Sequence, residues 1–181
     1  IQPYADASDA ERPHLLIESF KRAYADRYQP RNAAAVPLDR LTDAHLRRLM
    51  ASYRPDAQTP ASQVGLPTQL PPENPAATSF VTIDSNGSAV ACGLTMNNIF
   101  GIGRMARGTG IMLAATPGRY GGGPASLGPV VVVNPNSNLT FLAASASGGA
   151  IAPTSLVQVL LGVLVEEKPL EDVMNRKRLH H

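Results

Sequence analysis

The sequence predicts an α+β fold, and three observations lead to that prediction. Apolar residues with helical spacing open the chain, apolar runs typical of strands occupy its middle, and helical spacing returns near its end. Helices and strands that are segregated along a chain are typical of layered α+β folds. The chain has 181 residues, which is enough for one domain with a sizeable core or for part of a larger one.

Two helices are predicted in the N-terminal third. The first spans residues 14–26, follows Pro13, and has one apolar face made by Leu15, Leu16, Phe20, Ala23 and Tyr24. The second spans residues 42–52, with Thr42 as its N-cap and with three side chains expected to face inward: Leu46, Leu49 and Met50.

A proline-rich stretch follows at residues 54–76. It contains six prolines, which remove backbone donors and restrict the backbone, so neither a helix nor a central strand is expected there. We predict an exposed, extended linker. A linker of this kind is also a place where a chain can be cut and its new ends can move apart.

The middle of the chain predicts strands. Residues 78–84 and 88–95 flank Asn86-Gly87, a strong hairpin signal because both positions accept positive φ. A third strand is predicted at 109–114, after a tight turn at 100–103. A second hairpin is predicted from its two strands, 129–134 and 139–145. The valine run in the first of these is continuous, which favours a strand covered on both faces.

Two helices are predicted after Gly148-Gly149. The first, residues 153–165, is apolar nearly all round, which is typical of a helix buried between layers. The second, residues 169–177, has Leu170, Val173 and Met174 at helical spacing.

Composition excludes several classes of function. The chain is 44% hydrophobic and 17% charged, as globular domains are, and its net charge of +2 gives no case for nucleic acid. Cys92 is the sole cysteine, so no internal disulfide can form. The most apolar run, residues 155–165, is far shorter than the ~20 residues that span a membrane. No metal-ligand spacing and no phosphate-binding loop is present, so neither a metal nor a cofactor is predicted.

Six segments together carry a resemblance. They are HLLIESFKRAYADR at 14–27, TSFVTIDSNGSAVACGLTMNNIFG at 78–101, TGIMLA at 109–114, GP and a valine run at 128–133, SASGGA at 145–150, and NRKRLHH at 175–181. In this order and spacing, with the proline-rich stretch after the first, they resemble the gamma-glutamyltranspeptidase family of N-terminal-nucleophile hydrolases. The resemblance covers nearly the whole chain.

The resemblance implies a fold, a chemistry and a division of the chain. The fold is a four-layer αββα sandwich. The family is made as an inactive precursor that cuts itself before a threonine, whose hydroxyl then attacks a γ-glutamyl amide with its own α-amino group as base. Residues 1–53 correspond to helices at the end of the large subunit, 54–76 to the linker before the cut, and 77–181 to the small subunit.

The resemblance also implies partners. The substrate would be a γ-glutamyl small molecule or peptide, and the acyl group would pass to water or to an amino acid. Because the family fold interleaves strands from both subunits, a 181-residue piece would need the N-terminal large-subunit region, or self-association, to cover its apolar surface. Family members are commonly exported, which implies a periplasmic or extracellular location.

The nucleophile position departs from the family. Counting back from Asp84 and the Asn86-Gly87 turn, the nucleophile falls on Ala77, which has no hydroxyl and can neither cut the precursor nor attack a substrate. The next residue is Thr78, whose side chain points to the opposite face of a strand. Thr78 could act only after a local shift of the segment.

Other family site residues are retained. Thr95 stands where the family has a second threonine that bonds to the nucleophile, and Asn97 matches a residue near the substrate's α-carboxylate. Gly148 and Gly149 match the glycine pair whose N–H groups form the oxyanion hole.

The pocket departs further. The family has a substrate-binding Asp after the TGIMLA-type segment, but residues 114–118 read Ala-Ala-Thr-Pro-Gly. The serine pair that binds the substrate carboxylate is reduced to Ser126, which follows Ala125. A zwitterionic glutamyl group needs opposing charges in its pocket, so the change puts γ-glutamyl specificity in doubt.

Three hypotheses follow. The chain is a transpeptidase-like precursor whose nucleophile is replaced by alanine, or a non-catalytic homologue that serves as a binding or structural module, or a related amidase or acylase that uses Thr78. The double departure, at the nucleophile and at the substrate Asp, favours the second hypothesis more than a single change would.

Overall fold

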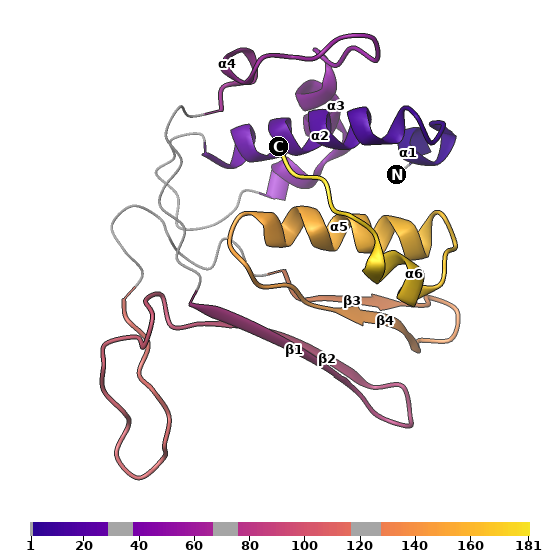
Figure 1. The fold of residues 1–181 in the computed structure, drawn as a ribbon. Coiled ribbons are helices and arrows are strands. Elements are labelled where there is room, and N and C mark those ends of the chain that lie inside the picture. Colours follow the sequence, from indigo (N-terminus) through magenta and orange to yellow (C-terminus); the bar gives the residue numbers. More distant parts are fainter. Residues whose placement is uncertain (1, 29–37, 67–75, 117–127) are drawn as a thin grey trace. The chain divides into compact units, whose positions relative to one another are not determined.

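The structure is a computed structural model that describes residues 2–28, 38–66, 76–116 and 128–181 (Figure 1). It contains both helices and strands, which confirms the predicted α+β class. The chain divides into two compact units, one of Ile1–Leu70 with Lys177–His181 and one of Pro71–Arg176.

The first unit is helical. Its elements are α1 (Gln2–Asp6), α2 (Arg12–Tyr28), the 3-10 helix η1 (Leu38–Leu41), α3 (Asp43–Met50) and α4 (Ala61–Val64). Helix α2 confirms the first predicted helix and extends it at both ends. The segment Lys177–His181 also belongs here, and the His181 ring lies edge-on to Tyr24 with 4.7 Å between ring centroids.

Helix α3 confirms the second predicted helix and its cap. The Thr42 hydroxyl accepts a hydrogen bond from the His45 N–H at 3.3 Å, which satisfies one of the free donors at the helix start. The inward orientation predicted for Leu46 is wrong, because 49% of this residue is exposed. No residue of this short helix is fully buried, although Leu49 and Met50 are half-buried.

The proline-rich stretch is not wholly extended. Pro60 is the N-cap of the short helix α4, and Gly65 ends it in the left-handed conformation with φ 78°. The expectation of a segment without helix is therefore wrong at α4. Proline is compatible with a helix start, since the first N–H groups have no partner within the helix. Residues 67–75 of this stretch lie outside the described residues.

The second unit contains two antiparallel hairpins. Strands β1 (Ala77–Ile83) and β2 (Ala89–Thr95) form one, and β3 (Val130–Val133) and β4 (Thr140–Ala144) form the other. Both hairpins were predicted and are confirmed. The strand predicted at 109–114 is wrong. Residues 96–116 form an irregular arm after β2, in which one isolated bridge joins Met105 to Met112.

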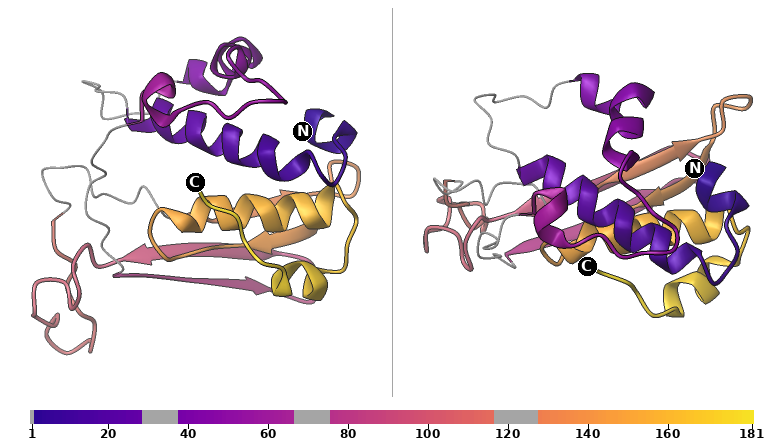
Figure 2. Two further views of the ribbon diagram at one scale, coloured as in Figure 1. Left: turned by 45° about the horizontal axis from the view of Figure 1, so that its top comes forward. Right: turned by 90° about the horizontal axis from the view of Figure 1, so that it is seen from above.

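Two burial expectations in this unit are wrong. The valine run of β3 alternates, with Val131 and Val133 each more than 40% exposed, so a single face is covered. Helix α5 (Ile151–Leu164) buries one side, while Ile151, Val157 and Leu164 are exposed. Figures 1 and 2 show α5 along β3 and β4.

Helix α6 (Leu170–Asn175) packs on α5 through a small residue. Val173 is 1% exposed, and its side chain would lie 2.7 Å from a Cβ added at Gly162. The absence of a side chain at Gly162 therefore lets the two helices approach closely. The other apolar residues predicted to align on this helix, Leu170 and Met174, are exposed.

Candidate active site

Ala77 lies directly opposite Thr95 at the open end of the β1–β2 hairpin. The pairing runs without a bulge to Ile83 and Ala89. Because side chains alternate between the faces of a strand, Ala77 and Thr95 share one face. The structure thus brings together the two positions for which the resemblance implies nucleophile and supporting threonine.

The turn of the hairpin determines this register. The Asp84 carboxylate accepts hydrogen bonds from the N–H groups of Asn86 at 2.8 Å and Ser88 at 2.9 Å, and Gly87 takes φ 83°. The backbone bond from Ser88, with the others in the turn, lowers the pKa of Asp84. A one-residue slip of β1 would break these bonds, so the turn holds Ala77 opposite Thr95.

The carbonyl oxygen of Ala76 accepts two hydrogen bonds. The Thr95 hydroxyl donates to it at 3.1 Å and the Met96 N–H at 2.9 Å. This carbonyl belongs to the peptide bond between Ala76 and Ala77, the bond before the position that the resemblance assigns to the nucleophile. Both donors come from the end of β2, so the hairpin register also positions them.

Asn97 holds the loop that follows β2. Its N–H donates to the Thr95 hydroxyl oxygen at 3.0 Å, and its side-chain Nδ2 donates to the Ala115 carbonyl at 2.7 Å. The Ala115 N–H donates to the Met96 carbonyl at 2.9 Å. Asn97 has φ 60°, a left-handed conformation that Asn tolerates better than most residues. These bonds join the end of β2 to residue 115.

Thr78 lies on the other face of β1. It pairs with Leu94 rather than with Thr95, and it is exposed. Its hydroxyl is therefore directed away from the face that carries Ala77. The hypothesis of a Thr78 nucleophile requires the register to change, against the bonds of the Asp84 turn.

Gly148 and Gly149 stand just before α5, with φ 132° and 73°. Both values favour glycine. The Ser145 hydroxyl, near the end of β4, donates to the Cys92 carbonyl of β2 at 3.2 Å. This bond brings the segment that leads to the glycine pair beside β2.

Of the remaining predicted site positions, some lie outside the described residues and others are described. Ser126 and Ala125 lie outside the described residues, as do Pro117 and Gly118. Ala115 is buried, and its backbone is bonded to both Met96 and Asn97. Among the described residues no cluster of three metal-binding side chains is found, and no helix is long and apolar enough to cross a membrane.

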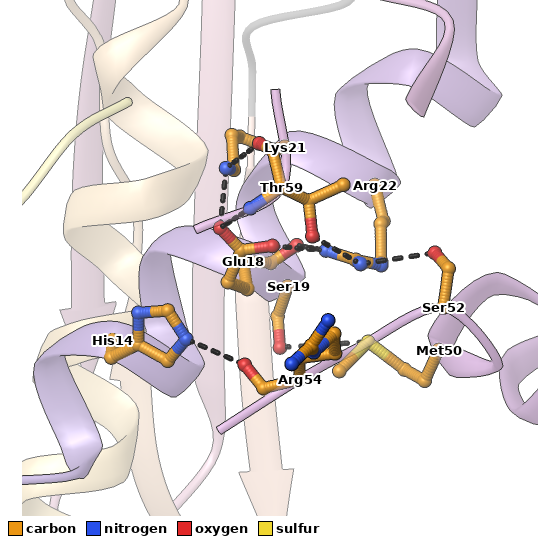
Figure 3. A network of polar contacts seen from close by, with 9 residues as sticks. All are labelled: His14, Glu18, Ser19, Lys21, Arg22, Met50, Ser52, Arg54 and Thr59. Atoms are coloured by element: carbon orange, nitrogen blue, oxygen red, sulfur yellow. Dashed lines mark hydrogen bonds and ion pairs between the residues drawn. The ribbon is translucent and has the colours of Figure 1, made fainter. Parts of the chain in front are cut away.

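Sequence reasoning missed a buried ionic cluster in the first unit (Figure 3). Glu18 is 0% exposed and contacts both Lys21 and Arg22, one turn along α2. The Glu18 carboxylate also accepts a hydrogen bond from the Thr59 N–H at 3.2 Å, and Arg22 donates to the Thr59 hydroxyl at 3.0 Å. The spacing of Glu18, Lys21 and Arg22 is the signal that could have indicated ion pairs on one helix face.

The cluster changes the ionisation of Glu18. Burial by itself raises its pKa, but hydrogen bonds from Lys21, Arg22 and Thr59 outweigh burial and lower the pKa from 4.5 to about 2. A buried carboxylate is stable only with such partners. The cluster thereby fastens Thr59, at the end of the segment that follows α3, to helix α2.

Comparison with known proteins locates the chain in a family. The gamma-glutamyltranspeptidase family model matches residues 3–119. The glutathione hydrolase proenzyme of Pseudomonas aeruginosa is 29% identical over 97% of this chain and 35% of its own length. That of Escherichia coli is 27% identical over 95% of this chain and 34% of its own length. The chain spans about a third of the length of these curated relatives.

A solved structure is also similar. The gamma-glutamyltranspeptidase from Pseudomonas nitroreducens complexed with L-DON is 26% identical, with a TM-score of 0.45 over 57% of this chain and 65% of that chain. The family model alone covers more than half of the chain. The chain therefore belongs to the gamma-glutamyltranspeptidase family.

Proposed function

We propose that this chain is part of a precursor of the γ-glutamyl amide hydrolase or acyltransferase type, built around an N-terminal nucleophile but with alanine at that position. One observation carries the proposal: the Thr95 hydroxyl donates to the carbonyl of Ala76, directly across the hairpin from Ala77. A residue with a hydroxyl at position 77 would lie beside the peptide bond that a self-cleaving precursor must break.

The two stages of the proposed chemistry use one nucleophile. First, the hydroxyl at position 77 attacks the carbonyl carbon of residue 76, and cleavage frees the α-amino group of residue 77. That amino group then serves as base when the same hydroxyl attacks a substrate amide. Gly148 and Gly149 would donate N–H groups to the oxyanion, while Asn97 and Ser126 would bind the substrate's carboxylate end.

As written, the chain lacks the group that both stages need. Ala77 has no hydroxyl, so we propose that this chain neither cuts itself nor turns over an amide. Thr95, Asn97, Gly148 and Gly149 would then be the surroundings of a nucleophile that is missing.

The family relationship supports an architecture for the whole protein. We propose that the two hairpins belong to a four-layer αββα sandwich completed by a region upstream of residue 1. Residues 1–53 would end the large-subunit part, 54–76 would be the linker before the cut, and 77–181 would form the small-subunit part. The exposed apolar side chains of both hairpins, Phe80, Val90, Val131 and Phe141 among them, support a covering partner of this kind.

The first prediction restores the hydroxyl. Ala77→Thr in the full-length protein should produce two fragments that separate between residues 76 and 77, because Thr95 already lies beside that bond. Intact-mass analysis measures the cut, and release of the aniline from a γ-glutamyl anilide measures turnover. Ala77→Val, which has the same branched shape without a hydroxyl, is the matched control and should stay uncut.

The alternatives give different results. The double departure, at Ala77 and at the substrate Asp, favours the non-catalytic homologue more than one change would. This hypothesis gains support if Ala77→Thr folds but neither cuts nor hydrolyses any amide. A cut immediately before Thr78 in the unchanged protein would instead support the Thr78 hypothesis and overturn the proposed role of position 77.

A further inference from the structure

We infer that the segment Thr95–Asn97 is an oxyanion site for the self-cleavage step, separate from the Gly148-Gly149 pair, and that Asn97 is its positioning residue. The inference rests on the proposed function, since it assigns the groups that would promote the cut between residues 76 and 77. It adds the Met96 N–H as a second donor.

The Ala76 carbonyl already has two hydrogen-bond donors in place. Its oxygen accepts from the Thr95 hydroxyl at 3.1 Å and from the Met96 N–H at 2.9 Å. When an oxygen nucleophile adds to a carbonyl carbon, negative charge develops on that carbonyl oxygen. Donors already aimed at it stabilise the charge without reorganisation. Two donors on one oxygen therefore make this peptide bond the one prepared for attack.

The hydroxyl proton of Thr95 is directed at the Ala76 carbonyl. The Thr95 oxygen accepts a hydrogen bond from the Asn97 N–H at 3.0 Å, which occupies one of its lone pairs. Its own O–H remains to donate, and the Ala76 oxygen is the acceptor within reach. Asn97 thus donates to Thr95 and Thr95 donates to the Ala76 carbonyl, so the two hydrogen bonds run in one direction and each polarises the other.

Asn97 controls these two hydrogen bonds through its backbone. Its N–H reaches the Thr95 oxygen in the left-handed conformation at φ 60°. The bond from its Nδ2 to the Ala115 carbonyl, at 2.7 Å, holds the residue in that conformation, and the Ala115 N–H returns a bond to Met96 at 2.9 Å. The resemblance implies that the Asn97 side chain binds substrate, but in the uncut chain this side chain is already hydrogen-bonded to the Ala115 carbonyl.

With a hydroxyl at position 77, the self-cleavage reaction proceeds through an ester. The hydroxyl oxygen forms a bond to the carbonyl carbon of residue 76, and the bond from that carbon to the nitrogen of residue 77 breaks. The hydroxyl proton passes to that nitrogen, which becomes an amine. Water then hydrolyses the ester, which leaves a carboxylate on residue 76 and regenerates the hydroxyl.

The first experiment uses the protein as it is, with Ala77 in place. Full-length protein labelled with carbonyl ¹³C and amide ¹⁵N on alanine shows resonances from consecutive alanines, and the Ala76–Ala77 signal is assigned by its loss in Ala76→Gly. Thr95→Val should move this ¹³C resonance upfield, because one of the two hydrogen bonds is removed. Thr82→Val, a change on the same hairpin away from the site, is the control. An unchanged resonance in Thr95→Val overturns the inference even if the proposed function is correct.

The second experiment measures the rate of cutting in the Ala77→Thr background. Thr95→Val should slow the cut by roughly 10²–10³-fold, the usual effect of removing one oxyanion donor. Asn97→Ala should slow it about tenfold, because alanine resists the left-handed conformation. Asn97→Gly accepts that conformation and should cut faster than Asn97→Ala, a rescue that a purely side-chain role does not give.

The outcomes separate the two claims. If Ala77→Thr never cuts, the proposed function fails, and the carbonyl resonance still decides whether the donors act on Ala76. If Ala77→Thr cuts, but the added change Asn97→Ala leaves the rate of cutting unchanged, the positioning role of Asn97 is overturned.

Discussion

Glu18 shows how a single buried residue holds a segment in place. It is fully buried, and its partners are two cations of its own helix and the backbone of Thr59. Removing one member of a buried ionic group leaves the others charged and unpaired, which costs roughly 3–5 kcal/mol. Figure 3 shows these contacts, together with the contact of His14 to the Arg54 carbonyl and that of Ser19 to Met50 at the end of α3.

We therefore expect Glu18→Gln to lower the free energy of unfolding by about that amount, as measured by urea denaturation. The matched control is Asp43→Asn, which removes the partner of Arg47 in a pair at 3.7 Å where both side chains are more than four-fifths exposed. An exposed pair contributes less than about 1 kcal/mol. Equal effects of the two changes would show that the Glu18 cluster does not stabilise the fold.

The same residue predicts a dependence on pH. The pKa of Glu18 is about 2 in the folded state against 4.5 as its ordinary value, so its contribution is complete above about pH 4.5. The contribution falls away as the pH drops from there towards 2, where the carboxylate takes up a proton. Circular dichroism should therefore show that acid weakens the parent more than Glu18→Gln across this range. Parallel curves would contradict the assignment.

At the scale of elements, the backbone path of the arm, residues 96–116, requires a glycine at one position. Gly101 has φ 55°, and a Cβ placed on it would lie 2.0 Å from the Leu113 carbonyl oxygen. The Ile102 N–H donates to that same oxygen at 3.0 Å, so the two sides of the arm meet there. A side chain at 101 has no space unless the backbone moves.

Gly101→Ala should therefore disrupt the arm and lower the free energy of unfolding by several kcal/mol. Gly103→Ala is the matched control, because Gly103 also has a positive φ, 69°, but a Cβ there meets nothing within 4 Å. The control pays the conformational cost alone, roughly 1–2 kcal/mol. Similar losses in both variants, measured by thermal unfolding, would show that the contact with Leu113 is not what requires glycine.

At the scale of the whole molecule, exposed apolar surface is the dominant feature. Large apolar side chains are exposed on both hairpins and along the arm, for example Ile83, Ile99, Phe100, Ile111 and Phe141. Monomeric soluble proteins rarely expose extended apolar surface, since it favours association. This surface agrees with a chain that spans a third of the length of its relatives.

We expect the isolated 181-residue chain to self-associate, and co-expression with the upstream region to keep it in solution. Light scattering over a dilution series measures the association. Phe141→Lys, at a residue 62% exposed, should weaken it, while Leu41→Lys in the other unit, 74% exposed, is the control for added charge. A dilute chain that is monomeric and unfolds cooperatively would count against the need for a covering partner.

Much of the local structure could be predicted because its signals lie close together in sequence. The Asn86-Gly87 turn and the Thr42 cap each depend on residues within a few positions of one another. The apolar face predicted for α2 is right only in part, because Ala23 is exposed and Ala25 is buried instead. The strand predicted at 109–114 failed because a strand needs a partner. An apolar run with two positive-φ glycines beside it, Gly108 and Gly110, forms an arm with a single bridge instead.

The sequence by itself determined the class of fold, the hairpin at 77–95, the family resemblance and the alanine where that resemblance expects a nucleophile, since each is a matter of residue identity and short spacing. The tertiary structure decided which groups meet across long separations. Thr95 donates to the carbonyl of Ala76, 19 residues away, and Glu18 binds Thr59, 41 residues away. The first contact follows once the Asp84 turn sets the hairpin register. No local pattern encodes the second, because it depends on how separate elements pack and on which buried polar groups must find partners.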